Sequence, residues 1–142
     1  MKNDLIFEKI TLTISIFLYA LVVPYLEINN THVFNPDWTP HVRIHEVWQL
    51  ITNTSIGILS LWLIYKKRQV LLPFILSMII TGSFLISFMI KNTYDGSMKY
   101  LDGSEKTLFG LNIGIVGFGF AFVLLVLSLI TYYRKNITTK NT

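Results

Sequence analysis

Residues 70–90 read VLLPFILSMIITGSFLISFMI, and this stretch contains no charged side chain. About 20 consecutive apolar residues let an α-helix cross the hydrocarbon core of a bilayer. Residues 10–26, 47–65 and 108–133 are similarly apolar. The chain of 142 residues is 52% hydrophobic and 14% charged, whereas a soluble domain is roughly 25% charged. The sequence therefore predicts an all-α integral membrane protein with the lipid bilayer as its surroundings.

The predicted organisation is a single membrane domain over residues 1–142, folded as a bundle of four transmembrane helices. We expect these helices at about 8–26, 40–65, 70–90 and 108–133, with long outer linkers at 27–39 and 91–107. Thr39 and Pro40 mark the start of the second helix, as its N-cap and its first helical position. No small-x-small cleavage site follows the first span, so we expect that helix to be retained.

Charge is distributed unevenly between the two sides that four spans define. The side with both termini carries eight basic and two acidic residues, and the side with the long linkers carries four basic and six acidic residues. The positive-inside rule then predicts cytoplasmic N- and C-termini. We expect a multi-pass protein of a bacterial cytoplasmic (inner) membrane. The net charge of +4 is thus a signal of topology, and no nucleic-acid partner is expected.

Cysteine is absent from the chain, which excludes a disulfide, a thiol nucleophile and a zinc-thiolate site. All three histidines, His32, His41 and His45, fall between residues 32 and 45. His41 and His45 are four residues apart, a helical spacing with which two imidazoles can reach one divalent metal ion. His32 and Asp37 are the candidates for further metal ligands. Interface anchoring or a structural hydrogen-bond network is the alternative interpretation of the pair.

A polar stripe continues below these histidines. Gln49 and Asn53 follow His45 at the same interval of four, and Thr52 lies close to the same helix face. Polar groups in hydrocarbon are costly unless they have partners, so we expect this stripe to face the bundle interior or a small wet pocket. The alternative is that these side chains only form hydrogen bonds between helices.

The other candidate site residues flank this stripe. His41, Gln49, Thr52 and Asn53 are expected to contact a ligand together with Trp38 and with Arg43, which is the candidate contact for an anion. In an enzyme, His45 would carry out acid–base chemistry because its ordinary pKa lies near neutrality, with Glu46 as a neighbouring acid–base partner. Packing and interface anchoring remain the alternatives for Trp38.

The fourth span carries small residues at helical spacing. Gly110, Gly114, Gly117 and Ala121 form one face that allows the close approach of another helix. The partner of this face is either the same bundle or, through Gly110, Gly114 and Gly117, a second copy or another membrane protein. Asn112 lies near the outer end of this span and is a further candidate for the polar site.

Residues 31–41 read THVFNPDWTPH. In this segment the chain resembles a group of small uncharacterised bacterial four-helix membrane proteins, broadly DoxX-like, in which a T-H-x-F-N-P-x-W-x-P-H stretch follows the first helix. A looser similarity is to the four-helix EXPERA proteins, which include sterol isomerases and lipid-binding proteins and place a histidine and a glutamate one helical turn apart. This chain has Gln49 one turn after His45. The resemblance implies four-helix topology and no particular reaction.

Three functions are consistent with the sequence. The leading one is a histidine-containing polar pocket at the extracytoplasmic face that binds a small ligand, a lipid or quinone-like molecule, or a divalent metal; a membrane enzyme is one form of it. A non-catalytic subunit of a membrane complex is the second. A small transporter is the third, which is disfavoured because no charge lies in the middle of a span.

Overall fold

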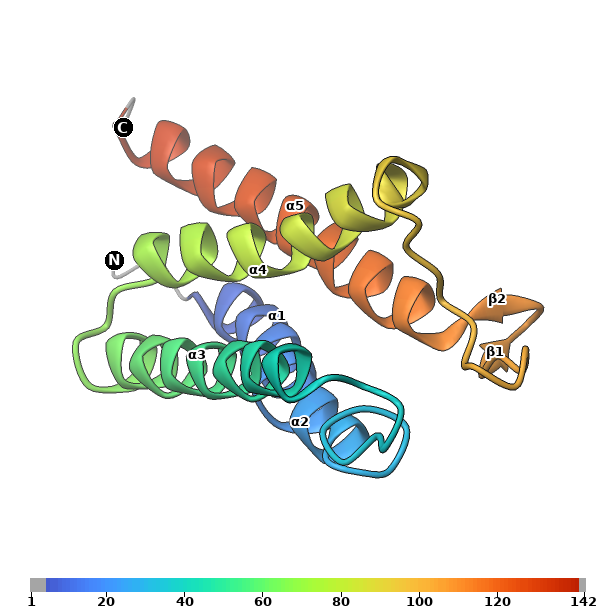
Figure 1. Ribbon diagram of the computed structural model, residues 1–142. Helices are drawn as coiled ribbons and strands as arrows, with labels where there is room; N and C mark the ends of the chain where they lie inside the picture. Colours follow the sequence, from blue (N-terminus) through green and yellow to red (C-terminus); the bar gives the residue numbers. More distant parts are fainter. Residues whose placement is uncertain (1–4, 141–142) are drawn as a thin grey trace.

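The computed structural model describes the backbone of residues 5–140 and the side chains of residues 5–137. Its long helices form a bundle (Figure 1). The first membrane span is α1 (Ile6–Phe17), the π-helical segment η1 (Leu18–Val22) and α2 (Val23–Glu27); the others are α3 (Pro40–Tyr65), α4 (Leu71–Met89) and α5 (Ile113–Lys140). Between α4 and α5 lie a 3-10 turn, η2 (Lys91–Thr93), and an antiparallel pair of short strands, β1 (Thr107–Leu108) and β2 (Leu111–Asn112).

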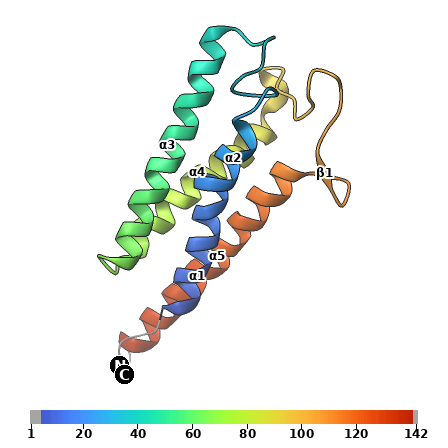
Figure 2. The same cartoon turned by 90° about the horizontal axis from the view of Figure 1, so that it is seen from below.

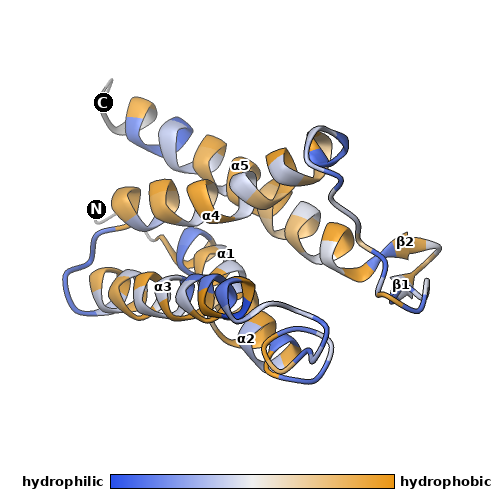
Figure 3. Ribbon diagram, in the orientation of Figure 1, coloured by the Kyte–Doolittle hydropathy of each residue, from blue (hydrophilic) through white to orange (hydrophobic). Residues whose placement is uncertain are grey.

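Four helices in the described part of the chain are long and apolar enough to cross a membrane, as in a multi-pass membrane protein. Large hydrophobic residues are exposed on all four spans, and the ribbons of these spans are largely apolar by hydropathy (Figure 3), as expected for helices surrounded by lipid. The predicted helical membrane bundle is therefore confirmed, and 40–65 matches α3 at both ends. The fourth helix begins at Ile113 and not at 108, because residues 107–112 form the hairpin. Its two-residue turn holds Phe109 and Gly110 at positive φ, as a type I′ hairpin turn requires.

The first span lies inside the bundle and packs against α3, α4 and α5. The core contains Leu12, Ile16 and Tyr19 from this span, with Phe74 from α4 and Leu125 from α5. Figure 2 shows both termini at one end of the bundle and the two long linkers at the other. We call these the terminal end and the linker end.

The π-helical turn η1 precedes Pro24. Because proline has no amide hydrogen, the carbonyl oxygen of Ala20 loses its ordinary partner four residues later. The hydroxyl of Thr54 on α3 donates a hydrogen bond of 3.1 Å to this oxygen. A neighbouring helix thus satisfies the backbone group that the irregular turn leaves open, as burial in lipid requires.

Gly57 allows α3 to approach η1 at this level. It is buried, and a Cβ atom built on it would overlap the Cβ of Ala20. The Ala20 side chain has no torsion with which to move away, so any side chain at position 57 must displace backbone. This close contact between α3 and η1 therefore depends on a glycine of α3, whereas the spacing in the sequence indicated the glycines of the fourth span.

Those later glycines lie inside the bundle or before the helix. Gly110 is in the hairpin turn, with φ of +78°, so it is not part of the predicted helix face. A Cβ at Gly114 would lie 3.2 Å from the Phe84 ring of α4, and one at Gly117 would lie 3.5 Å from Leu18. Gly114 and Gly117 thus face side chains of the same chain, and a second copy or another membrane protein as a partner of these glycines stays a prediction.

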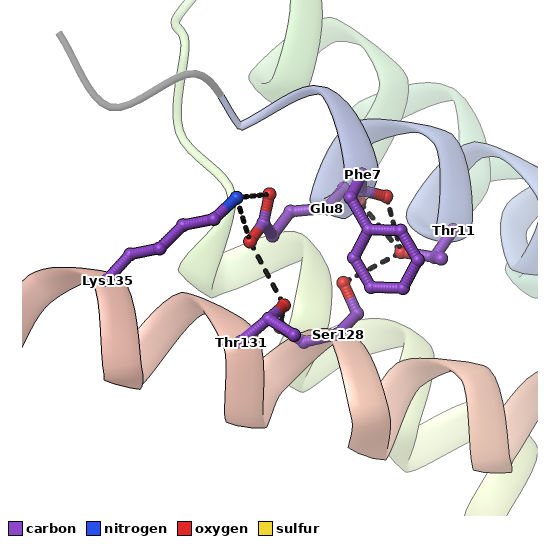
Figure 4. A network of polar contacts seen from close by, with 6 residues as sticks. All are labelled: Phe7, Glu8, Thr11, Ser128, Thr131 and Lys135. Carbon is purple, nitrogen blue, oxygen red and sulfur yellow. Dashed lines mark hydrogen bonds and ion pairs between the residues drawn. The ribbon is translucent and has the colours of Figure 1, made fainter.

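A buried ion pair joins α1 to α5 near the terminal end (Figure 4). The side chain of Glu8 is 0% exposed, and its Oε1 lies 2.9 Å from Nζ of Lys135. The Thr131 hydroxyl donates a hydrogen bond of 3.1 Å to the same oxygen, and one turn further the hydroxyls of Thr11 and Ser128 are 2.8 Å apart. Glu8 is one of the two acidic residues that the sequence places on the side with both termini, outside the membrane. The structure instead places it within the helix contact.

Candidate functional site

A cavity of about 1380 Å³ lies at the linker end. Its walls come from η1 and α2, from α3 and α4, and from the first turns of α5, while residues of both long linkers line its outer part. Pockets for drug-sized molecules usually measure about 300–1,000 Å³, so this cavity is large enough for a longer molecule. Its apolar lining includes Leu18, Val22, Ile56, Ile80, Val116 and Phe118.

The polar wall of the cavity comes from one face of α3. Glu46, Gln49 and Asn53 all line it, at the spacings of three and four that keep side chains on one helix face. Glu46 and Asn53 are seven residues apart and so differ by only about 20° around the helix axis. Within residues 5–137, none of these three side chains has a hydrogen-bond or ion-pair partner. Their polar atoms are therefore free to contact a ligand.

His32 belongs to the part of the lining that the first long linker contributes. Its Nε2 is 2.7 Å from Oε2 of Glu27, and its Nδ1 is 2.8 Å from the Thr31 hydroxyl. The imidazole also meets Trp38 and Tyr100 edge to face, with ring centroids 5.7 and 5.9 Å apart. Because Tyr100 belongs to the second long linker, His32 connects the two linkers across the cavity.

Side-chain hydrogen bonds hold the first long linker in place. The Asn35 side chain is buried; its Nδ2 donates to the Thr31 carbonyl and its Oδ1 accepts from the Asp37 amide. Thr39 accepts a hydrogen bond from the Val42 amide, which confirms its prediction as the N-cap of α3. These contacts fix the chain that carries Asp37 and Trp38, both of which line the cavity.

His41 and His45 lie elsewhere. Both are exposed and neither lines the cavity; their Nε2 atoms are 3.1 Å apart, and His45 lies beside Trp48. Consecutive residues of a helix point about 100° apart. Because the side chain of Glu46 faces the cavity, that of His45, the residue before it, points away. Residues four apart on an α-helix differ by about 40° around its axis. His41 is three such steps from Asn53, so the two side chains point about 120° apart. Of the two residues singled out for proton transfer, only Glu46 lines the cavity.

The predicted metal ligands are not brought together. His32 is paired with Glu27, Asp37 lines the cavity, and the other two histidines contact each other on the outside. No group of three His, Cys, Asp or Glu side chains in the described part of the chain is placed to hold a metal ion. The arrangement therefore offers no built metal centre among those residues.

The remaining predicted contacts divide between lining and support. Thr52 lines the cavity, and so does Asn112, whose Oδ1 accepts the Gly114 amide of α5 at 2.8 Å. Arg43 does not line it; its Nη2 donates a hydrogen bond of 3.1 Å to the Trp38 carbonyl. Arg43 thus positions a lining residue. Ser83 adds a hydroxyl from α4 that the sequence did not connect with the site.

The charged residues of the lining differ in exposure. Lys99, Asp102 and Lys106 come from the second long linker and are exposed, while Glu27 and Glu46 belong to α2 and α3. Hydrogen bonds from the Ser104 hydroxyl and amide lower the pKa of Asp102, so this carboxylate is ionised at neutral pH. Nζ of Lys106 lies 5.8 Å from the centroid of the Tyr100 ring. The basic residues of the lining are thus exposed residues of the second long linker, and the charged residue that α3 contributes is acidic.

Comparison of the chain with protein families, with curated proteins and with solved structures finds no match.

Proposed function

We propose that this protein binds an amphipathic molecule, a lipid or a quinone-like compound, in the cavity at the linker end. The observation that carries the proposal is the combination of two kinds of wall in one space. Apolar side chains from four spans surround its inner part, and the unpartnered polar side chains of Glu46, Gln49 and Asn53 face it from α3. An apolar tail and a polar head would each find a matching surface.

The dimensions of the cavity suit such a molecule. Along α3 the lining extends from Glu46 to Ile56, which at 1.5 Å a residue is about 15 Å. Six lining residues belong to the segment 31–41, on which the resemblance to DoxX-like proteins rests: Thr31, His32, Asn35, Pro36, Asp37 and Trp38. The segment that carries the resemblance would therefore serve to close the cavity.

The binding experiment compares two double variants of the purified protein. Ser83→Phe with Val116→Phe places two phenyl rings in the cavity, whereas Ser55→Phe with Val123→Phe places them at residues that do not line it. Organic extracts of the wild-type protein and the control should contain a co-purified amphiphile at near-stoichiometric amount by mass spectrometry. The cavity variant should contain several-fold less, because the rings occupy the space of the tail. Equal amounts in both variants, at equal unfolding temperatures, would refute binding in this cavity.

The proposal includes a direction across the membrane. Because the terminal end carries most of the basic residues, the positive-inside rule favours cytoplasmic termini and a cavity at the extracytoplasmic side of a bacterial cytoplasmic membrane. The cysteine-free chain allows single-cysteine labelling at exposed positions. Cysteine in place of His41 should react with an impermeant maleimide on intact cells, and cysteine in place of Gln69 only after permeabilisation. The reverse pattern would invert the proposed topology.

A further inference from the structure

We propose that the polar head of the bound molecule carries an ammonium group and that Glu46 holds it. This inference rests on the proposed binding of an amphiphile in the cavity. It adds a preference among head groups, for a cation over a neutral or anionic head, which the binding of a lipid or a quinone-like compound does not by itself require.

The side chains of the α3 wall have hydrogen-bond acceptors that no residue of the described chain uses. An ionised carboxylate only accepts hydrogen bonds, and the side-chain oxygens of Gln49 and Asn53 add two more acceptors on the same wall. None of the three has a partner among residues 5–137. An ammonium group is a donor of up to three hydrogen bonds. It would satisfy the carboxylate of Glu46 and a neighbouring amide oxygen at once.

The balance of charges around Glu46 also favours a cationic head group. This side chain lies within electrostatic reach of both Glu27 and His32, which form an ion pair with each other. Two carboxylates therefore lie near one imidazole, and when both are ionised their charge exceeds that of a protonated His32. A carboxylate without a counter-ion is costly where water is restricted. A cationic head would supply the missing charge.

The other aromatic and charged side chains of the lining favour a cationic head group as well. Trp38 lines the cavity beside His32, and aromatic rings attract cations through their faces. The Tyr100 ring also lines the cavity, but Nζ of Lys106 already lies 5.8 Å from its centroid. The two lysines of the lining, Lys99 and Lys106, are exposed residues of the second long linker. An anionic head that sat against this wall of α3 would lie beside the carboxyl group of Glu46.

The test uses Trp38 as a reporter. Trp48 and Trp62 are the other two tryptophans of the chain and neither lines the cavity, so phenylalanine at both leaves Trp38 alone. Three amphiphiles that share the same tail, brominated close to the head, and that carry a primary ammonium, glucoside or sulfonate head are added to this protein in an unbrominated detergent. The ammonium compound should quench Trp38 at a concentration about tenfold lower than the others, which corresponds to about 1.4 kcal/mol.

Glu46→Gln separates the head preference from binding as such. It keeps the shape of the side chain and removes its charge, so the ammonium compound should lose its advantage while the glucoside binds as before. Glu105→Gln, which removes a charge from the second long linker outside the cavity lining, should change nothing. Equal quenching by all three heads, or an unchanged preference in Glu46→Gln, would overturn the ammonium inference and leave amphiphile binding standing. Absence of saturable quenching by every head would instead overturn the proposed function.

Discussion

Gly57→Ala is expected to destabilise the bundle by about 3 kcal/mol, at the upper end of the cost of overpacking a core. The added Cβ would overlap that of Ala20 and would also lie 3.3 Å from Ile16. Neither the buried methyl group of Ala20 nor the backbone of η1 can move without separating α3 from the first span. Unfolding of the detergent-solubilised variant, followed by circular dichroism, should occur at a clearly lower temperature than that of the wild-type protein.

Gly119→Ala is the matched control. A Cβ at position 119 of α5 meets nothing within 4 Å, and alanine favours helix over glycine by about 1 kcal/mol. This variant should be as stable as the wild-type protein or slightly more stable. If Gly57→Ala unfolded at the same temperature as Gly119→Ala, the close contact of α3 with η1 would be wrong.

The second large effect is expected at the buried ion pair. Lys135→Met leaves the carboxylate of Glu8, which is 0% exposed, without its cation. Removing one partner of a buried pair costs about 3–5 kcal/mol. We expect about 3 kcal/mol, because the Lys135 side chain is 37% exposed and water is near.

Glu8→Gln in the Lys135→Met background should restore most of the lost stability. A neutral amide needs no counter-ion, and it can still accept the hydrogen bond of Thr131. The two single variants and the double variant form a cycle that can be measured by unfolding in detergent. Additive losses from the two substitutions would contradict a direct ion pair between these residues.

The helices were predictable because lipid demands long apolar segments, and these are visible in the sequence without any tertiary information. The start of α3 was predictable for a local reason, since Thr39 and Pro40 suit an N-cap and a first helical position. The start of α5 was not predictable, because the hairpin at 107–112 contains apolar residues that extend the apolar run of α5 toward the N-terminus. The buried pair of Glu8 could have been suspected from the polar spacing Glu8, Thr11 and Ser15 on one face of α1.

The lining of the cavity was predicted in part. Gln49, Thr52 and Asn53 were expected to face a polar pocket, and the structure places all three in the lining of the cavity. The spacing of four also included His41 and His45, but each step of four rotates the side chain by about 40°, so these two residues lie outside the cavity. A spacing of seven keeps side chains on almost the same face, and Glu46 is seven residues before Asn53. Nothing in the local sequence connects His32 with Tyr100, because the chain between them crosses the bundle twice. The resemblance to DoxX-like proteins and the EXPERA similarity stay predictions.

The hydrogen bond from Thr54 to the carbonyl of Ala20 has an evolutionary consequence. The hydroxyl at position 54 is useful because the proline at position 24 removes a backbone donor, so neither residue is neutral alone. Related chains should therefore either keep both side chains or lose both. In a chain with an ordinary amide at position 24, position 54 should drift freely to valine or alanine.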